Sequence, residues 1–95
     1  MQNMVCLIGR LLTDIKENDS KMTLGVQRMY KNENGEYLTD FIDVYIFGEM
    51  FRRINEYIKK GDLVAVKGRL EVKDNQLKVI ADKLSFLTSN KKEEE

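Results

Sequence analysis

Residues 21–47, KMTLGVQRMYKNENGEYLTDFIDVYIF, decide the fold, because apolar and polar residues alternate on both sides of a single turn signal. The turn signal is the pair Asn34-Gly35 within residues 30–37, YKNENGEY, and such a pair favours a tight β-hairpin. The stretch therefore predicts two half-buried strands, residues 21–28 and 39–47. The residues expected on their inward side are Met22, Leu24, Val26, Ile42, Val44 and Ile46.

The segments on either side of this hairpin have different apolar patterns. Residues 49–60 have the apolar spacing of a helix, and Gly61 is a suitable stop signal at its end. Residues 4–12 form the expected first strand, whose run Met4–Ile8 is apolar on both sides and needs cover on both faces. One cover is the core, and the other is the helix or a second copy of the chain. Within this run, Cys6 is expected to be a small buried hydrophobe.

Strand spacing returns after the predicted helix. It predicts strands over residues 64–72, with Gly68 as a bend or bulge, and over residues 76–82, after a tight turn at Asp74-Asn75. Their inward residues are expected to be Val64, Val66, Leu70, Val72, Leu77, Val79 and Ala81. Three strands, a helix and two strands is the order of the OB-fold, an all-β, five-stranded Greek-key barrel with one helix between strands 3 and 4.

Length and composition limit the organisation of the chain. Its 95 residues suit one domain over residues 1–87, followed by a short charged tail, residues 88–95, that is expected to be disordered. Sixteen Lys and Arg balance sixteen Asp and Glu, and 42% of the residues are hydrophobic, as in a soluble globular protein. With no long apolar run and no signal-peptide layout in MQNMVCLIGR, we expect a cytoplasmic protein with no membrane association.

Two absences narrow the class of function. The chain has no His, the usual general base and commonest metal ligand, and Cys6 is its only cysteine. Because no nucleophile–base pair or metal-ligand spacing is found either, we expect no enzyme, no metal and no cofactor. The zero net charge means that binding to nucleic acid would depend on local placement of cations rather than on an overall positive field.

The outward side of residues 39–47 carries the strongest indication of function. Alternation turns Phe41, Tyr45 and Phe47 away from the core, and five of the eight aromatic residues lie between positions 30 and 47. Exposed rings gathered in this way call for a covering partner, and unpaired bases stack on such rings for roughly 1–3 kcal/mol each. The cations that strand position makes candidates for phosphate contacts are Arg28, Lys31, Lys67, Arg69, Lys73 and Lys78.

Over about residues 2–87 the sequence resembles the bacterial and phage single-stranded DNA-binding proteins (SSB). The shorter matching motifs are IGRL (residues 8–11), NGEY (34–37) and TDFI (39–42). The longest matching stretch runs from FG (47–48) through EYIKKGD (56–62) to VKGRL (66–70).

The resemblance implies an OB-fold that binds single-stranded DNA without sequence preference, coats and protects it in replication, recombination or repair, and performs no catalysis. It also implies a homotetramer built from dimers, with a dimer as the alternative, in the bacterial cytoplasm or nucleoid. Tyr30 and Phe41 stand where the family often has base-stacking tryptophans, and Phe47 stands where it has a stacking phenylalanine. The doubly apolar first strand fits the region that the family uses in subunit pairing.

The chain departs from the family pattern in three respects. The hairpin that closes at Asp74-Asn75 is shorter than the family's long arm, and the chain has no Trp, which reduces the ring area per base. The apolar-tipped acidic tail that recruits other proteins is missing, so such recruitment is not expected. Two other functions remain open. A protein-interaction module of primosome type would use the outward rings as a subunit interface, and an RNA-binding OB domain would use the same chemistry.

Overall fold

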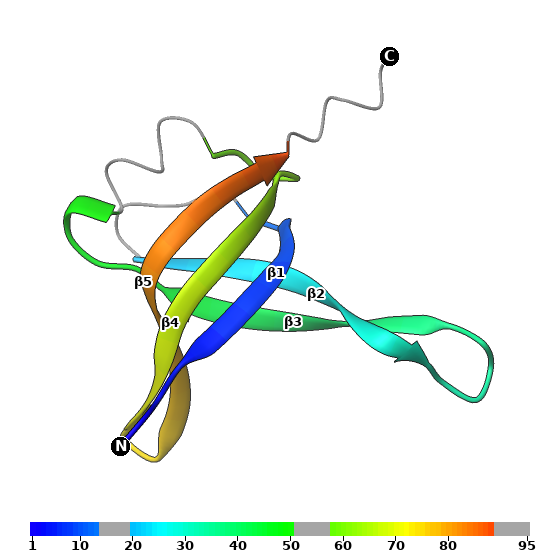
Figure 1. Ribbon diagram of the computed structural model, residues 1–95, viewed down its shortest axis with the longest axis horizontal. Coiled ribbons are helices and arrows are strands. Elements are labelled where there is room, and N and C mark those ends of the chain that lie inside the picture. The colour runs from blue at the N-terminus through cyan, green and yellow to red at the C-terminus, as the bar shows by residue number, and fades with distance from the viewer. Residues whose placement is uncertain (14–19, 51–57, 89–95) are drawn as a thin grey trace.

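A computed structural model of the chain describes residues 1–13, 20–50 and 58–88. In these residues five strands form one closed barrel in the order β1-β2-β3-β5-β4 (Figure 1). Neighbouring strands are antiparallel, except that β3 and β5 run parallel. The strands are β1 Val5–Leu11, β2 Lys21–Lys31, β3 Tyr37–Tyr45, β4 Leu63–Lys73 and β5 Gln76–Thr88. The predicted all-β, five-stranded architecture is confirmed.

The barrel interior is filled by side chains that alternate along the strands. The buried cluster consists of Leu11, Met22, Leu24, Val44, Ile46, Ile58, Val64, Val66 and Ala81. Val26, Ile42 and Val79 are partly buried and pack against this cluster. The inward side predicted for residues 21–28 and 39–47 is therefore confirmed, and it commits the other side of both strands to the surface.

The β2–β3 hairpin extends beyond the barrel as a twisted two-stranded arm (Figure 1). Asn32 builds its turn, because its side-chain oxygen accepts hydrogen bonds from the backbone N–H groups of Asn34 and Glu36, each at 2.9 Å. Gly35 has a φ of +80°, a left-handed conformation that glycine adopts without strain. Since Asn32 closes the turn locally, β2 continues to Lys31, beyond the predicted end of the strand at residue 28.

A bulge shapes the β4–β5 pair. The register shifts between Lys67 and Gly68, so that Asp82 is an extra residue in β5. At this place the two backbones approach closely, because a Cβ on Gly68 would lie 1.9 Å from the carbonyl oxygen of Ile80. The predicted bend or bulge at Gly68 is thus confirmed, and close backbone approach is its physical reason.

The same bulge makes β5 longer than predicted. Ala81 faces the core before the extra residue and Leu84 packs against the core after it, so the alternation is out of phase on the two sides. A pattern of strict period two stops at residue 82, whereas β5 continues to Thr88. The predicted end of this strand at residue 82 is wrong for that reason.

The tip of the β4–β5 hairpin lies beyond the barrel. Its turn is the predicted Asp74-Asn75 pair, with φ values of 53° and 64° that both residue types tolerate. Leu70, Val72 and Leu77 are 36%, 71% and 66% exposed. The prediction that these three residues face inward is wrong, because the hairpin tip lies beyond the barrel and neither of its faces contacts the core.

β1 has one covered face and one open face. Leu7 packs against the core, whereas Ile8 is 59% exposed and Cys6 is exposed as well. The prediction that Cys6 is buried is wrong, because the barrel covers only the inner side of a strand that is apolar on both sides.

The predicted helix, residues 49–60, falls mainly on residues 51–57, which lie outside the described residues, so it remains a prediction. On its far side Ile58 is 3% exposed in the core, and Gly61 has a φ of +94°, as expected of a glycine that follows a helix. Of the predicted tail, Thr88 belongs to β5, and residues 89–95 lie outside the described residues.

Candidate nucleic-acid interface

The three rings assigned to base stacking are all exposed. Tyr30 on β2 is 63% exposed, Phe41 on β3 is 72% exposed, and Phe47, just beyond β3, is 57% exposed. A fourth ring, Tyr37, lies on the arm with the Lys31 ammonium 5.6 Å from its centre. Single exposed apolar residues are common on protein surfaces, but four such rings on one hairpin and its end are typical of a surface that binds a partner.

A groove of about 550 Å³ lies beside β3, between this strand and the start of β5. This volume is in the range of roughly 300–1,000 Å³ that ligand pockets occupy. The residues that line it are Phe41, Ile42, Asp43, Tyr45, Gln76, Leu77, Lys78 and Val79.

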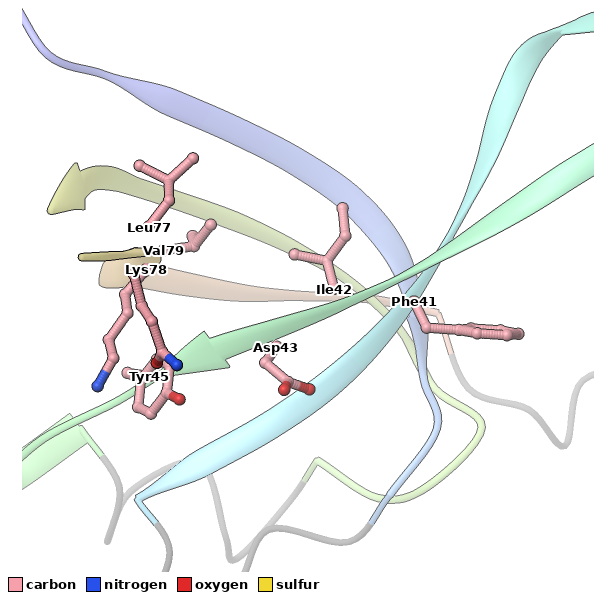
Figure 2. Close-up of a pocket in the computed structure, with 8 residues that line it drawn as sticks. Phe41, Ile42, Asp43, Tyr45, Leu77, Lys78 and Val79 are labelled. Atoms are coloured by element: carbon pink, nitrogen blue, oxygen red, sulfur yellow. The ribbon is translucent and has the colours of Figure 1, made fainter. Parts of the chain in front are cut away.

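The lining side chains point in three directions (Figure 2). Lys78 reaches toward Tyr45, and its ammonium lies 4.9 Å from the ring centre. Leu77 and Val79 point to the opposite side of β5, toward Ile42, and Phe41 points away from the other labelled side chains. The groove therefore has a cationic and aromatic side near Tyr45 and an apolar side near Leu77.

Arg28 forms a two-point ion pair with Asp40 across the arm. Its Nε and Nη2 atoms donate to the carboxylate oxygens at 3.0 and 2.9 Å. This hydrogen bonding, opposed by partial burial, holds the pKa of Asp40 below its ordinary value. The pKa of Arg28 is raised, first by the hydrogen bond to Asp40 and, to a lesser extent, by nearby Tyr30. A phosphate that binds Arg28 has to compete with this carboxylate.

Arg69 also has carboxylate partners. Its Nε donates to Glu71 at 2.9 Å and its Nη1 to Asp82, and these contacts raise the pKa of the guanidinium, the hydrogen bond to Glu71 most of all. Both partners lie on the same hairpin, so Arg69 is held along the β4–β5 surface.

The remaining candidate cations are spread over different parts of the barrel. Lys31 lies on the arm and Lys78 lies in the groove beside Tyr45, whereas Lys73 is exposed at the tip of the β4–β5 hairpin. Lys67 lines a second groove of about 330 Å³ with Cys6 and other residues of β1, β4 and β5. The structure thus brings Lys31 and Lys78 beside rings and does not bring Lys67 to the β3 surface.

Sequence reasoning missed two participants in this surface. Tyr45 was placed on the outward side but not among the binding residues, and Asp40 was not recognised as the partner of Arg28. Both roles depend on which strand lies next to which. A neighbouring candidate cation would have marked Tyr45 as a binding residue. That cation is Lys78, and it comes close to Tyr45 only because β3 pairs in parallel with β5.

Among residues 1–13, 20–50 and 58–88 no group of three or more His, Cys, Asp or Glu is placed to hold a metal ion. In the same ranges no helix has the length and apolar character needed to cross a membrane.

Fold and surface together define a small closed β-barrel that presents aromatic rings and cations on one hairpin and one groove. The chain belongs to the single-strand binding protein family, whose model matches residues 2–87. It is 34% identical to single-stranded DNA-binding protein 1 of Staphylococcus aureus over 92% of this chain, and it spans 66% of that protein's length. It is also 34% identical to single-stranded DNA-binding protein 1 of Clostridium acetobutylicum, over 94% of this chain and 96% of the relative.

Solved structures share the fold at lower sequence identity. The mitochondrial single-stranded DNA-binding protein of S. cerevisiae superposes with a TM-score of 0.76 at 20% identity, covering 94% of this chain and 99% of the other. The SSB of Plasmodium falciparum, solved in complex with single-stranded DNA, gives a TM-score of 0.68 at 21% identity, covering 92% and 96% of the two chains.

Proposed function

We propose that this protein binds single-stranded DNA without base-sequence preference, and that it coats and protects strands exposed in replication, recombination or repair without catalysing a reaction. The observation that carries the proposal is the outward exposure of Tyr30, Phe41 and Phe47 on one hairpin and its end. Membership of the single-strand binding protein family supports it, as do curated relatives that are named single-stranded DNA-binding proteins.

Base stacking and phosphate contacts have separate parts in this proposal. Each exposed ring offers its face to an unpaired base, and because every base has such a face, the binding tolerates any sequence. Lys31 and Lys78 lie beside rings, where they can neutralise phosphates, and Lys73 extends this charge to the hairpin tip. Arg28 and Arg69 contribute only where a phosphate displaces their carboxylate partners, and Lys67 contacts only a strand that continues onto the β4 surface.

Removal of single rings tests the stacking role. Phe41→Ala and Phe47→Ala should each weaken binding to fluorescein-labelled oligothymidine by roughly 1–3 kcal/mol, measured by fluorescence anisotropy, with unchanged circular dichroism. Phe86→Ala is the matched control, since Phe86 is 43% exposed on β5 outside the candidate interface. Wild-type affinity in both test variants would refute stacking on these rings.

A protein-interaction module that uses the outward rings as its subunit interface is the second candidate, and the exposure of Tyr30, Phe41 and Phe47 favours it. For the DNA-binding function we propose instead that the outer face of β1, with exposed Cys6 and Ile8, joins subunits in a homotetramer, or in a dimer as the alternative. Light scattering of Phe47→Ala without DNA separates the two functions. If the variant loses the oligomer of the wild type, the rings form a subunit interface; if the mass is unchanged and DNA binding is weaker, they bind DNA.

Several finer features belong to the same proposal. Residues 1–87 act as the binding domain, with residues 49–60 forming a helix between β3 and β4, in the bacterial cytoplasm or nucleoid. We propose DNA rather than RNA as the ligand because the chain belongs to the single-strand binding protein family, whose relatives are named single-stranded DNA-binding proteins. Competition of labelled oligothymidine by unlabelled oligodeoxythymidine and oligouridine of equal length checks this choice, and stronger competition by oligouridine would reverse it.

A further inference from the structure

We propose that Tyr45, flanked by Lys21 and Lys78, forms a further nucleotide-binding position, at which a base of single-stranded nucleic acid stacks on the phenol ring and the two lysines hold the adjoining phosphates. The proposal rests on the proposed single-stranded DNA binding. It adds a position to those of Tyr30, Phe41 and Phe47, and it gives the groove between β3 and β5 a specific occupant.

Each of the two strands that border β3 carries a lysine on the face of the sheet where Tyr45 lies. Lys21 of β2 is the direct antiparallel partner of Tyr45, and residues directly opposite each other in such a pair share one face of the sheet. Lys78 of β5 reaches the ring from the other side, with its Nζ 4.9 Å from the ring centre, as Figure 2 shows. The Tyr45 ring therefore has the Lys78 ammonium beside it and Lys21 as its cross-strand partner.

The state of the Tyr45 side chain suits a stacking platform. The ring is partly buried between its neighbours, so little conformational freedom remains to be lost when a base covers its open part. The contact with the ring orients Lys78. An ammonium has three donors and no acceptor, so Lys78 can rest against the ring and donate to a phosphate at the same time.

The charges around Tyr45 favour an anion. Asp43, on the same face of β3, lies with its Oδ2 atom 3.7 Å from the Lys21 Nζ, and its Oδ1 atom accepts a hydrogen bond from the Thr23 hydroxyl at 2.8 Å. An exposed ion pair of this length is weak, so Lys21 can turn toward a phosphate while Thr23 keeps Asp43 on the β2 side. Glu71 of β4 is the direct partner of Lys78, but its carboxylate is held by the Nε of Arg69 at 2.9 Å. Asp43 is then the carboxylate that offsets the charges of Lys21 and Lys78.

The spacing between Phe41 and Phe47 leaves room for a contact of this kind if one strand of nucleic acid joins the two rings. Phe41 and Phe47 are six positions apart, or about 20 Å along an extended chain. A stacked nucleic-acid strand advances about 3.4 Å per nucleotide, so several nucleotides must cross the interval. Tyr45 is the aromatic residue between them in sequence, and it lines the groove beside β3 together with Phe41.

Removal of the Tyr45 ring tests the position. Tyr45→Leu should weaken binding of fluorescein-labelled oligothymidine by about 5- to 150-fold, the equivalent of one lost stacking contact, whereas Tyr45→Phe keeps the ring and should bind as the wild type does. Thermal melting of both variants checks that the barrel is intact. If Tyr45→Leu binds like the wild type while Phe41→Ala is weakened, the Tyr45 position is wrong and the proposed DNA binding stands.

The charge at this position is tested by a matched pair of lysine variants. Lys78→Gln should reduce the slope of log affinity against log salt concentration by about 0.7, the effect of one lost phosphate contact on a single strand. Lys59→Gln removes the same charge from an exposed position before β4, outside both grooves, and should leave the slope unchanged. Equal slopes for the two variants would overturn the role of Lys78.

A measurement on the unaltered protein guards against a folding defect in the Tyr45→Leu variant. Oligodeoxyuridine that carries 5-iodouracil is bound and irradiated, and the cross-linked residues are located by fragment-ion mass spectrometry. A cross-link to Tyr45 supports the proposal. Cross-links to Phe41 or Phe47 without any to Tyr45 reject the position alone, whereas no complex at all rejects the proposed DNA binding as well.

Discussion

Arg28 and Asp40 hold each other across the β2–β3 arm through two hydrogen bonds, next to the exposed ring of Tyr30. Their side chains are 38% and 45% exposed, so the pair contributes little to stability. It has a larger consequence for binding, because the guanidinium that a phosphate requires is already engaged. Strand position made Arg28 a phosphate candidate but could not show this, since Asp40 belongs to another strand.

Asp40→Asn should therefore strengthen binding to oligothymidine. The variant frees the Arg28 guanidinium and removes a negative charge from the arm, so one more phosphate can be neutralised. The slope of log affinity against log salt concentration should become steeper by about 0.7. An anisotropy titration at several salt concentrations measures both effects, and weaker binding by the variant would show that Asp40 supports the interface instead.

The same pair should make stability depend on pH in the acid range. Because the pKa of Asp40 is lowered in the folded state, its ionised form stabilises the fold above the ordinary aspartate pKa of about 3.9, and this contribution is lost as the pH falls through the folded value. Wild type should melt slightly above Asp40→Asn at neutral pH, and the difference in Tm should vanish on acidification. A difference that does not change with pH would contradict this.

The presence of each strand can be predicted from the alternation of apolar and polar residues. The ends of the strands depend on pairing with other strands, which this alternation does not reveal. Alternation predicted the inward side of β2 and β3 correctly, because every second side chain of these strands faces the barrel core. It failed in β5, where the extra residue Asp82 reverses the phase, and at Val72 and Leu77, where the hairpin extends past the core. An insertion of one residue and the reach of a hairpin are properties of strand pairing rather than of one strand's composition.

The close contact at the bulge predicts a stability defect. Gly68→Ala should lower the free energy of unfolding by roughly 1–3 kcal/mol, because the new Cβ meets the carbonyl oxygen of Ile80. Lys67→Ala, at the exposed neighbouring position, should change it by about 0.5 kcal/mol or less. Urea unfolding measures both, and equal stabilities of the two variants would show that the strands separate there without cost.

At the scale of the whole molecule, the zero net charge is distributed unevenly. Lysines lie beside rings on the arm and the groove, whereas both candidate arginines are held by carboxylates and Lys67 lies in the other groove. The outward rings could be predicted from sequence because their orientation depends only on the alternation of side chains along one strand. The grouping of cations around them could not, because it depends on the order in which five strands close the barrel.

The open face of β1 predicts the assembly of subunits. Ile8→Glu places a charge on the outer side of this strand and should lower the mass measured by light scattering. Gln27→Glu introduces the same charge at an exposed position of β2 and should keep the mass of the wild type. If both variants keep the wild-type mass, subunits do not join through β1.

Base stacking on the exposed rings is tested most directly by comparing oligothymidine with an abasic phosphodiester strand of equal length, since both carry the same phosphates and only the first carries bases. Anisotropy competition at one salt concentration gives the ratio of the two affinities. Loss of roughly 1–3 kcal/mol for each ring in use is expected for the abasic strand. Equal affinities would mean that phosphates alone hold the strand and that Tyr30, Phe41 and Phe47 do not bind bases.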